Sequence, residues 1–447
     1  MLKKWKSVTM VGVFTMGMLV MGNFVQAQKK ESVPINIIVW GGIRAEGPTR
    51  GLAKDYQKLN PHVKFNIEAG PYEDYTTRVA FDVVSGTNAY DLVWLDPKYL
   101  GGFVNAGYVE PLDRYLLEDT AWWEDFKGDV YRNVLYGPQN QYRCLYKGHW
   151  YALPSGDSNT AVFYYRKDVL AEAGIAKAPE TWDEVFEAAE KVHRPPKMFA
   201  IANTYRRFWA WDTFMTYLYS AGGRLWDPET KIPRINDKAA IRAAEVYKET
   251  FKWVPKDALN WGEELLHEAL AKSGTIAMSP VAWANPVPTD PNLSAFAEVT
   301  VAKVVPRLDG NARPAMAGFF WIMSTRSRFK DEAWNFLKFE MSRENNEKRI
   351  EYGGQPCRIS ALLHPKAVEL GKPYFQVLAD SLETAGVRPT DPEFIQAEQI
   401  MGKELVDILM ERKSIKQALD DAQAAIWQVF VGSGRFEPED VPPEYRK

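Results

Sequence analysis

The chain is 447 residues long, which is too long for one ordinary hydrophobic core and predicts two or three domains. Its hydrophobic content of 46% and charged content of 25% are typical of a water-soluble globular protein. The formal net charge of −3 argues against a protein that binds nucleic acid or anionic membranes, and we expect no nucleic-acid partner.

The N-terminus has the pattern of a secretory signal peptide. Three lysines lead into an apolar segment over 8–21, and Val25-Gln26-Ala27 places small residues as a cleavage site requires. The apolar segment is shorter than the roughly 20 residues that a membrane anchor needs. We therefore expect residues 1–27 to be cleaved near Ala27 on export to the periplasm. Because the three lysines leave with it, the formal charge falls from −3 to −6.

The chain contains two cysteines, Cys144 and Cys357. In an oxidising compartment they could pair, and two unpaired thiols are an equally good interpretation. Their spacing fits no zinc or redox motif, and the five histidines show no paired spacing. We expect no metal and no cofactor.

The mature chain opens with alternating strands and helices. Apolar strands are predicted over 35–40, 63–67 and 92–95, and helices over 52–59 and 72–85. This order implies right-handed crossovers and a mostly parallel sheet flanked by helices. Ligands of such sheets bind beyond the carboxyl ends of the strands.

A second unit of the same type begins near residue 159. A strand is predicted over 162–165, and Thr181 and Glu184 form a capping box at the start of a helix. Further elements follow: helices near 205–220, 238–252 and 263–272, and strands over 275–278 and 299–305.

An aromatic strand over 319–323 supplies what the first unit lacks, so the chain must return to it. The helix after that strand is predicted over 331–342, with Trp334 and Leu337 in the core. We expect two α/β lobes joined by several hinge crossings, with residues 28–158 plus 312–355 in one lobe and 159–311 plus 356–447 in the other. The cleft between them would open and close.

Five motifs in this order resemble one known family. They are Gly148–Pro154 with Phe163–Asp168 (G-x-x-Y-x-x-P … Y-Y-N-K-D), Pro179–Glu184 (P-x-T-W-D-E), Gly274–Met278 before Trp283 (G-x-x-A-M … W), Lys330–Phe339 (K-x-x-A-W-x-F-L-K-F) and Gly353–Arg358 (G-x-x-P-x-R). The chain resembles the extracellular solute-binding proteins, family 1, sugar-binding type, of bacterial ABC importers. Arg166 departs from the family's asparagine, and the loop over 136–146 is longer than usual.

The resemblance implies a type II periplasmic-binding-protein fold, a receptor that is not an enzyme, and membrane permease subunits as partners. It also implies that Trp283 and Arg358 lie near the ligand. We expect the receptor to be a monomer.

A carbohydrate or polyol site needs flat aromatic platforms and groups that bind hydroxyls in pairs. Candidates of these types stand at predicted strand ends, in loops and at a helix start. The predicted ligand-binding residues are Trp40, Arg44, Glu46, Tyr72, Asp96, Asp157, Tyr205, Trp209, Trp211, Asp212, Trp283, Phe320, Trp321 and Arg358. Helical spacing cannot place Trp209 and Trp211 on one face, so at least one of them should face the cleft or solvent. From the strand, Phe320 or Trp321 should line the cleft.

Two alternatives stay open. The same scaffold could bind a peptide, an organic anion or a metal complex. An organic anion stays possible because the candidate cleft residues include the arginines Arg44, Arg206, Arg207 and Arg358. A secreted glycoside hydrolase would need two carboxylates roughly 5–9.5 Å apart, and no motif singles out such a pair.

Overall fold

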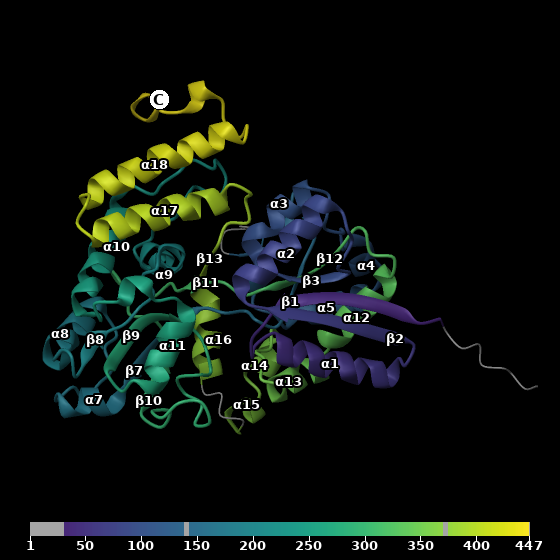
Figure 1. The fold of residues 1–447 in the computed structure, drawn as a ribbon, viewed down its shortest axis with the longest axis horizontal. Coiled ribbons are helices and arrows are strands. Elements are labelled where there is room, and N and C mark those ends of the chain that lie inside the picture. Colours follow the sequence, from purple (N-terminus) through teal and green to yellow (C-terminus); the bar gives the residue numbers. More distant parts are fainter. Residues whose placement is uncertain (1–30, 138–142, 370–373, 447) are drawn as a thin grey trace, which may run out of the picture.

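The computed structural model describes residues 31–137, 143–369 and 374–446. It contains two mixed α/β lobes lying side by side, and a pair of long C-terminal helices above the second (Figure 1). The predicted signal segment, and residues 138–142 of the loop that the sequence suggested is long, fall outside the described residues.

The first lobe is built on a five-stranded sheet of order β2-β1-β3-β12-β6. Strand β1 pairs in parallel with β2 and β3, whereas β12 is antiparallel to both β3 and β6. The strands are β1 (Val33–Trp40), β2 (Val63–Gly70), β3 (Leu92–Leu95), β6 (Leu153–Pro154) and β12 (Phe320–Met323). The predicted return of the chain through an aromatic strand is therefore present, although this strand runs against its neighbours.

Helices cover this sheet. The longer ones are α1 (Glu46–Leu59), α2 (Tyr72–Ser85), α12 (Lys330–Glu340) and α13 (Arg343–Glu351), and the shorter ones are α3 (Leu100–Asn105), α4 (Asp113–Glu118), α5 (Thr120–Gly128) and α6 (Arg132–Leu135). Trp334 and Leu337 of α12 are buried, as predicted. The helix predicted over 331–342 ends at Glu340, and α13, which the prediction missed, begins after the cap Ser342. Its sequence, RENNEKRIE, has no apolar stripe, so periodicity could not reveal it.

The second lobe is built on a four-stranded sheet of order β10-β7-β9-β8. Only β8 and β9 are parallel, so the expectation of a mostly parallel sheet was wrong here. The strands are β7 (Ala161–Arg166), β8 (Phe199–Ile201), β9 (Ile276–Trp283) and β10 (Thr300–Lys303). Strand β9 runs five residues beyond the predicted end at Met278, which places Trp283 on the sheet itself.

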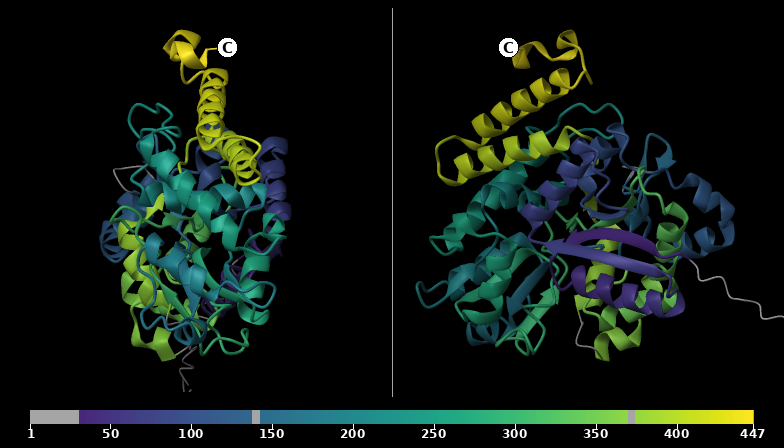
Figure 2. Two further views of the ribbon diagram at one scale, coloured as in Figure 1. Left: turned by 90° about the vertical axis from the view of Figure 1, so that its left-hand side faces the viewer. Right: turned by 45° about the vertical axis from the view of Figure 1, so that its right-hand side comes forward.

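Helices pack around this second sheet. They are α7 (Lys167–Glu172), α8 (Trp182–Val192), α9 (Arg207–Ser220), α10 (Lys238–Thr250) and α11 (Glu263–Lys272). Helix α8 starts with the predicted capping box of Thr181 and Glu184. The C-terminal pair, α17 (Phe394–Leu409) and α18 (Ile415–Gly432), packs on α9 and α10 and stands out from the lobe in both views of Figure 2.

Several segments cross between the lobes. Strand β11 (Ala315–Met316) pairs with β13 (Gly386–Val387), and Thr160 bridges to Met316. Between β12 and β13 lie α14 (Ile359–Leu362), α15 (Pro365–Glu369) and α16 (Tyr374–Thr384), and much of 357–387 shares the core of the first sheet. The predicted boundary assigned that stretch to the second lobe, so the limits of the lobes stay a proposal.

A small hairpin of β4 (Leu145–Tyr146) and β5 (His149–Trp150) completes the described strands. Both thiols are buried and free: Cys144 Sγ lies 3.8 Å from the Val134 carbonyl, and Cys357 Sγ lies 3.5 Å from Asn346 Oδ1. Of the two open interpretations, the structure has the unpaired one.

Candidate functional site

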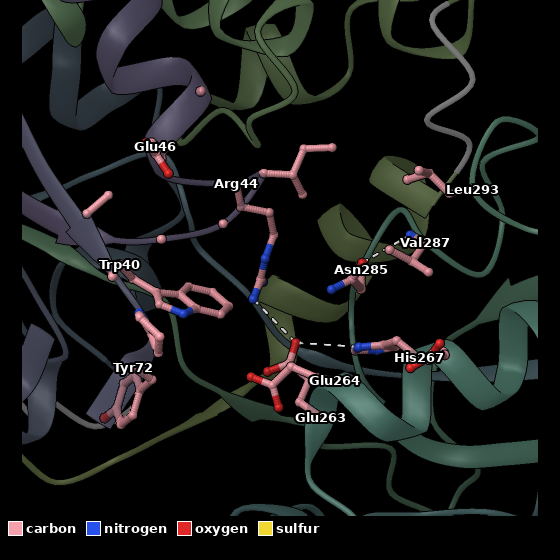
Figure 3. A pocket seen from close by; sticks show the side chains of 18 of the residues that line it. Trp40, Arg44, Glu46, Tyr72, Glu263, Glu264, His267, Asn285, Val287 and Leu293 are labelled. Atoms are coloured by element: carbon pink, nitrogen blue, oxygen red, sulfur yellow. Dashed lines mark hydrogen bonds and ion pairs between the residues drawn. The ribbon is translucent and has the colours of Figure 1, made fainter. Parts of the chain in front are cut away.

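A cleft of about 1130 Å³ separates the two lobes. On one side it is lined by the loops that follow β1 and β2, including Trp40, Arg44 and Tyr72, and on the other by α11 and the loop after β9 (Figure 3). These loops follow the carboxyl ends of parallel strands, which is where the fold places ligands. Glu46 also lines the cleft, at its solvent-exposed edge, where Glu46 Oε1 lies 2.8 Å from Arg50 Nε.

Arg44 spans the cleft. Its Nη1 lies 3.2 Å from Asp157 Oδ1, and its Nη2 lies 3.3 Å from Glu263 Oε1 at the start of α11 (Figure 3). The guanidinium carbon also stands 5.1 Å from the ring centre of Trp40. Burial raises the pKa of Asp157 despite this nearby cation. One arginine therefore connects a platform of the first lobe to a carboxylate of the second.

The loop that carries Arg44 is fixed from beneath by a second buried arginine. Arg349 of α13 donates to the Arg44 carbonyl at 3.3 Å and to the Gln355 carbonyl at 3.0 Å, and it pairs with the buried Glu340 carboxylate. A Cβ at Gly156 (φ +87°) would lie 2.4 Å from Arg349 Nε, so the crossing must carry glycine there.

His267 of α11 supports the far wall. Its Nε2 donates to the Trp283 carbonyl at 2.9 Å, and its Nδ1 lies 3.7 Å from Glu263. Burial and the positive charge of Arg44 lower its pKa to about 4. The imidazole is therefore neutral at physiological pH, and it orients the end of β9 beneath the cleft.

Beneath the cleft is a smaller cavity of about 40 Å³, which we call the inner chamber. It is enclosed by aromatic and polar side chains from both lobes. The residues beyond those shared with the cleft are Asp157, Asn159, Trp209, Asp212, Trp283, Ala317, Gly318, Phe319 and Arg388. Among the described residues, Asn159 Oδ1, Asp157 Oδ2 and Arg388 Nε have no hydrogen-bond partner. Buried polar atoms normally have one, so these are positioned for ligand or water.

Arg388 connects the lobes a second time. Its Nη1 lies 3.0 Å from Asp96 Oδ2, its Nη2 lies 2.7 Å from Asp212 Oδ2, and its carbon stands 5.4 Å from the Trp283 ring centre. Arg388 lowers the pKa of Asp96, which also accepts from Tyr72 at 2.8 Å. Burial raises the pKa of Asp212 to about 7.

The aromatic side chain that lines the cavity from the segment at β12 is not one of the two predicted. Phe319 lines the chamber and stacks on Trp94, with ring centres 4.1 Å apart and planes at 2°. Phe320 and Trp321 are buried in the first core, so the prediction that one of them lines the cleft was wrong. The physical reason is Gly318 (φ +97°), whose backbone turns the chain just before β12. A Cβ there would lie 2.0 Å from the Asp157 carbonyl oxygen.

Two other predicted residues, Arg358 and Tyr205, are also buried away from the cleft. Arg358 is 1% exposed: its Nε donates to the Met341 carbonyl at 2.7 Å, and its Nη1 lies 3.2 Å from Asp129. It joins α5 and α12 within the first lobe instead of reaching the cleft. Tyr205 donates to or accepts from Thr250 at 2.8 Å in the second core.

Helix α9 separates two of the predicted tryptophans. Trp209 lines the inner chamber, whereas Trp211 is fully buried beside Phe214 and Phe394. Two residues two positions apart on a helix point to different sides, which is why Trp209 lines the inner chamber and Trp211 does not. Placement beside the cavity is the observation, and a role in ligand binding remains a proposal.

Sequence reasoning missed several lining residues. They are Asn159, Glu263, Glu264, His267, Phe319 and Arg388. Glu263 and Glu264 were inside a correctly predicted helix, and only its position across the cleft gives them a role. The signal for Arg388 was weak: a lone arginine in Gly386-Val387-Arg388-Pro389 follows a small strand that two-residue periodicity cannot identify.

In the described ranges, no three His, Cys, Asp or Glu side chains gather in a way that would hold a metal ion. Within those same ranges, no helix combines the length and apolar character needed to cross a bilayer. The cleft and the inner chamber are lined by aromatic rings, carboxylates and arginines.

The model of the family "bacterial extracellular solute-binding protein" matches residues 44–347. The chain belongs to this family. Members of the bacterial extracellular solute-binding protein family are binding proteins, so membership agrees with the expected receptor. The suspected two-lobed fold is likewise confirmed by solved structures.

Two solved structures superpose on nearly the whole of this chain. A ribitol complex of an ABC transporter solute-binding protein from Agrobacterium radiobacter K84 superposes with a TM-score of 0.77 at 23% identity, covering 90% of this chain and 99% of that one. A maltose-bound MalE3 of T. maritima gives a TM-score of 0.77 at 19% identity, covering 89% and 100%. At these identities the likeness shows the fold alone.

Among curated relatives, a putative binding protein of Brucella abortus (strain 2308) is 28% identical over 193 residues. The match covers 43% of this chain and 42% of the relative. The match thus spans less than half the length of that relative, so it does not identify the ligand or the partners of this chain.

Proposed function

We propose that this solute-binding protein is a periplasmic receptor that captures a neutral carbohydrate or polyol between its lobes and delivers it to the permease of an ABC importer. The observation that carries the proposal is the inner chamber, where rings of Trp209, Trp283 and Phe319 face carboxylates and an unpaired amide oxygen. Apolar sugar faces stack on such rings, and hydroxyls bind such oxygens. The ribitol and maltose bound by the two structural neighbours belong to this ligand class.

The charge of the cleft supports a neutral ligand over an organic anion. Arg44 lines both the cleft and the inner chamber, and Arg388 lines the inner chamber. Each is already paired with two carboxylates: Asp157 and Glu263 for the first, Asp96 and Asp212 for the second. Glu264 adds another acid to the lining. An anion would therefore enter a site with more negative than positive groups.

Export, processing and oligomeric state belong to the same proposal. Cleavage near Ala27 would release the mature chain into the periplasm, where it would work as a monomer. N-terminal sequencing of the exported protein should begin at Gln28, and light scattering should give the mass of one chain. A mature protein that retained residues 1–27 would contradict the export proposal.

The ligand proposal is tested by isothermal titration against mono-, di- and oligosaccharides and alditols. At least one should bind, and Trp209→Ala should weaken that ligand by about tenfold because a stacking face is lost. Trp253→Ala is the matched control, since Trp253 packs on His193 in the second lobe, outside the cleft. Silence of the whole panel, or equal losses in both variants, would count against the proposal.

A further inference from the structure

A lysine also connects the two lobes. Lys98 lies in the short helix η1 (Pro97–Tyr99), which directly follows β3 of the first lobe, whereas Glu398 lies in α17, which packs on α9 of the second lobe. Lys98 Nζ lies 3.0 Å from Glu398 Oε2 and 3.3 Å from Glu398 Oε1. Each of the two side chains is only 1% exposed. The lobes therefore meet at a buried ion pair.

This ion pair lies on the edge of the first sheet that faces the second lobe. Lys98 follows the carboxyl end of β3, and the loops after β1 and β2 at the same edge bring Trp40 and Tyr72 to the cleft. Lys98 Nζ stands 5.6 Å from the ring centre of Tyr72. Neither Lys98 nor Glu398 lines the cleft or the inner chamber. The pair is therefore a contact between the facing surfaces of the lobes, and its two partners would separate when the lobes move apart.

The charge of Lys98 compensates that of Glu398 in this interface. Burial on its own lowers the pKa of a lysine, but the carboxylates of Glu398 and Asp96 raise the pKa of Lys98 above its ordinary value, so the ammonium stays charged. Across the part of the chain that the structure describes, Glu398 has no other hydrogen bond or ion pair. Asp96, in contrast, has a cation of its own in Arg388. Removal of Lys98 would thus leave the Glu398 carboxylate buried without a paired cation.

A buried ion pair between two lobes affects their arrangements unequally. We call the arrangement in which Lys98 and Glu398 touch the closed one, and in an open one water would solvate both charges. On closure the attraction between the charges is offset by the water that each of them loses, so the pair adds little net free energy. Loss of one partner leaves the other charge buried and uncompensated, which disfavours closure. Apolar side chains of similar size at both positions are neutral or favourable instead.

We propose that Lys98 and Glu398 determine how far the free protein populates the closed arrangement. Closure requires both charges, and the water that they lose keeps closure readily reversible. This balance belongs to the free protein and needs no solute. Only its effect on the capture of a sugar or polyol rests on the proposed function. The affinity for a solute that the closed arrangement alone holds is proportional to the fraction of the protein that is closed.

The balance is tested by small-angle X-ray scattering of the full mature protein without solute. Lys98→Met and Glu398→Met each leave one buried charge without its partner, whereas the double variant Lys98→Met/Glu398→Met removes both charges. Each single variant should therefore have a larger radius of gyration than the double variant, because only the single variants penalise closure. The double variant should be at least as compact as the unchanged protein. Equal radii of gyration in the single and double variants would overturn the proposal.

A lysine that pairs with the same helix inside one lobe is the matched control. Lys413 Nζ lies 2.6 Å from Glu404 Oε2 of α17, and both residues belong to the second lobe. Lys413→Met should therefore leave the radius of gyration unchanged, and an expansion as large as that of Lys98→Met would overturn the proposal. Thermal unfolding identifies any variant that fails to fold. If the double variant fails, Glu398→Gln keeps the shape of the side chain without its charge, and a radius of gyration equal to that of Lys413→Met would overturn the proposal.

The effect on capture is measured by titrating the same variants with ribitol, maltose and the rest of the saccharide and alditol panel. For the compound that binds the unchanged protein most tightly, Lys98→Met should weaken binding by about tenfold or more, and the double variant should return to within about threefold or bind more tightly. A loss that persists in full in the double variant would indicate direct contact with the solute and overturn the proposal. Silence of the whole panel would contradict the proposed function, whereas the scattering comparison would still decide the role of the ion pair.

Discussion

Removal of Arg388 should destabilise the protein more than any single change at the rim of the cleft. In Arg388→Met, two buried carboxylates lose their shared cation. Asp96 keeps the Tyr72 hydroxyl at 2.8 Å and the Lys98 amide at 3.2 Å, whereas Asp212 has no hydrogen bond to the described residues. Breaking a buried ion pair from one side costs about 3–5 kcal/mol. Since Asp96 stays partly satisfied, we expect the lower end, about 3 kcal/mol at pH 7.

The loss should grow with pH, and the sign follows from Asp212. Burial already raises its folded-state pKa to about 7, above that of the unfolded chain, and loss of the cation raises it further. A raised carboxyl pKa gives stability that is full below the unfolded value and is lost as pH rises towards the folded value. Urea unfolding of Arg388→Met should therefore show a larger deficit at pH 8 than at pH 6. Adding Asp212→Asn to Arg388→Met should recover about 1–2 kcal/mol. A deficit below about 1 kcal/mol, or one that does not depend on pH, would refute this reasoning.

Three further outcomes are expected. Phe319→Ala should weaken the best-binding saccharide or polyol about tenfold, whereas Phe320→Ala should cost about 3–5 kcal/mol of stability and leave the affinity of the folded protein within about threefold; the reverse pattern in titration and urea unfolding would contradict the site. Because the pKa of His267 is lowered to about 4, the stability it supports is full above about pH 6.5 and is lost as pH falls below it, by up to about 1.4 kcal/mol per pH unit. His267→Gln should flatten that slope between pH 7 and 5, and an unchanged slope would exclude this imidazole. Burial raises the pKa of Cys144 and Cys357 to about 12, so iodoacetamide should label neither in the native protein and both in urea, as mass spectrometry would show.

The sequence specified local structure well because local structure depends on local patterns. Helices α2 and α11 have the predicted limits, and the capping box at Thr181 was visible in four residues. Helix α13 escaped because its stability comes from Arg349 and Ser342, a buried ion pair and a cap, and not from an apolar stripe. Strand direction in the second lobe could not be read either, since periodicity is the same for parallel and antiparallel strands.

The site was predictable where it depends on strand ends and unpredictable where it depends on distant contacts. Trp40 and Tyr72, which line the cleft, could be placed because parallel strands end at one edge. Arg358 and Arg388 show the limit. Both are buried arginines that pair with aspartates, and only the position of their partners decides that one fixes the first lobe and the other faces the chamber.

The buried Arg349 has a consequence for how the two lobes would move. Arg349 holds the backbone of Arg44 and the turn at Gln355, and it packs closely on Gly156. These contacts make this side of the first lobe rigid. A hinge motion of the two lobes would then bend the connecting segments and leave the cleft lining of the first lobe unchanged. Because this lining is preorganised, binding of a solute costs little free energy for the ordering of loops. The selectivity of the site is then set by the structure of the free protein.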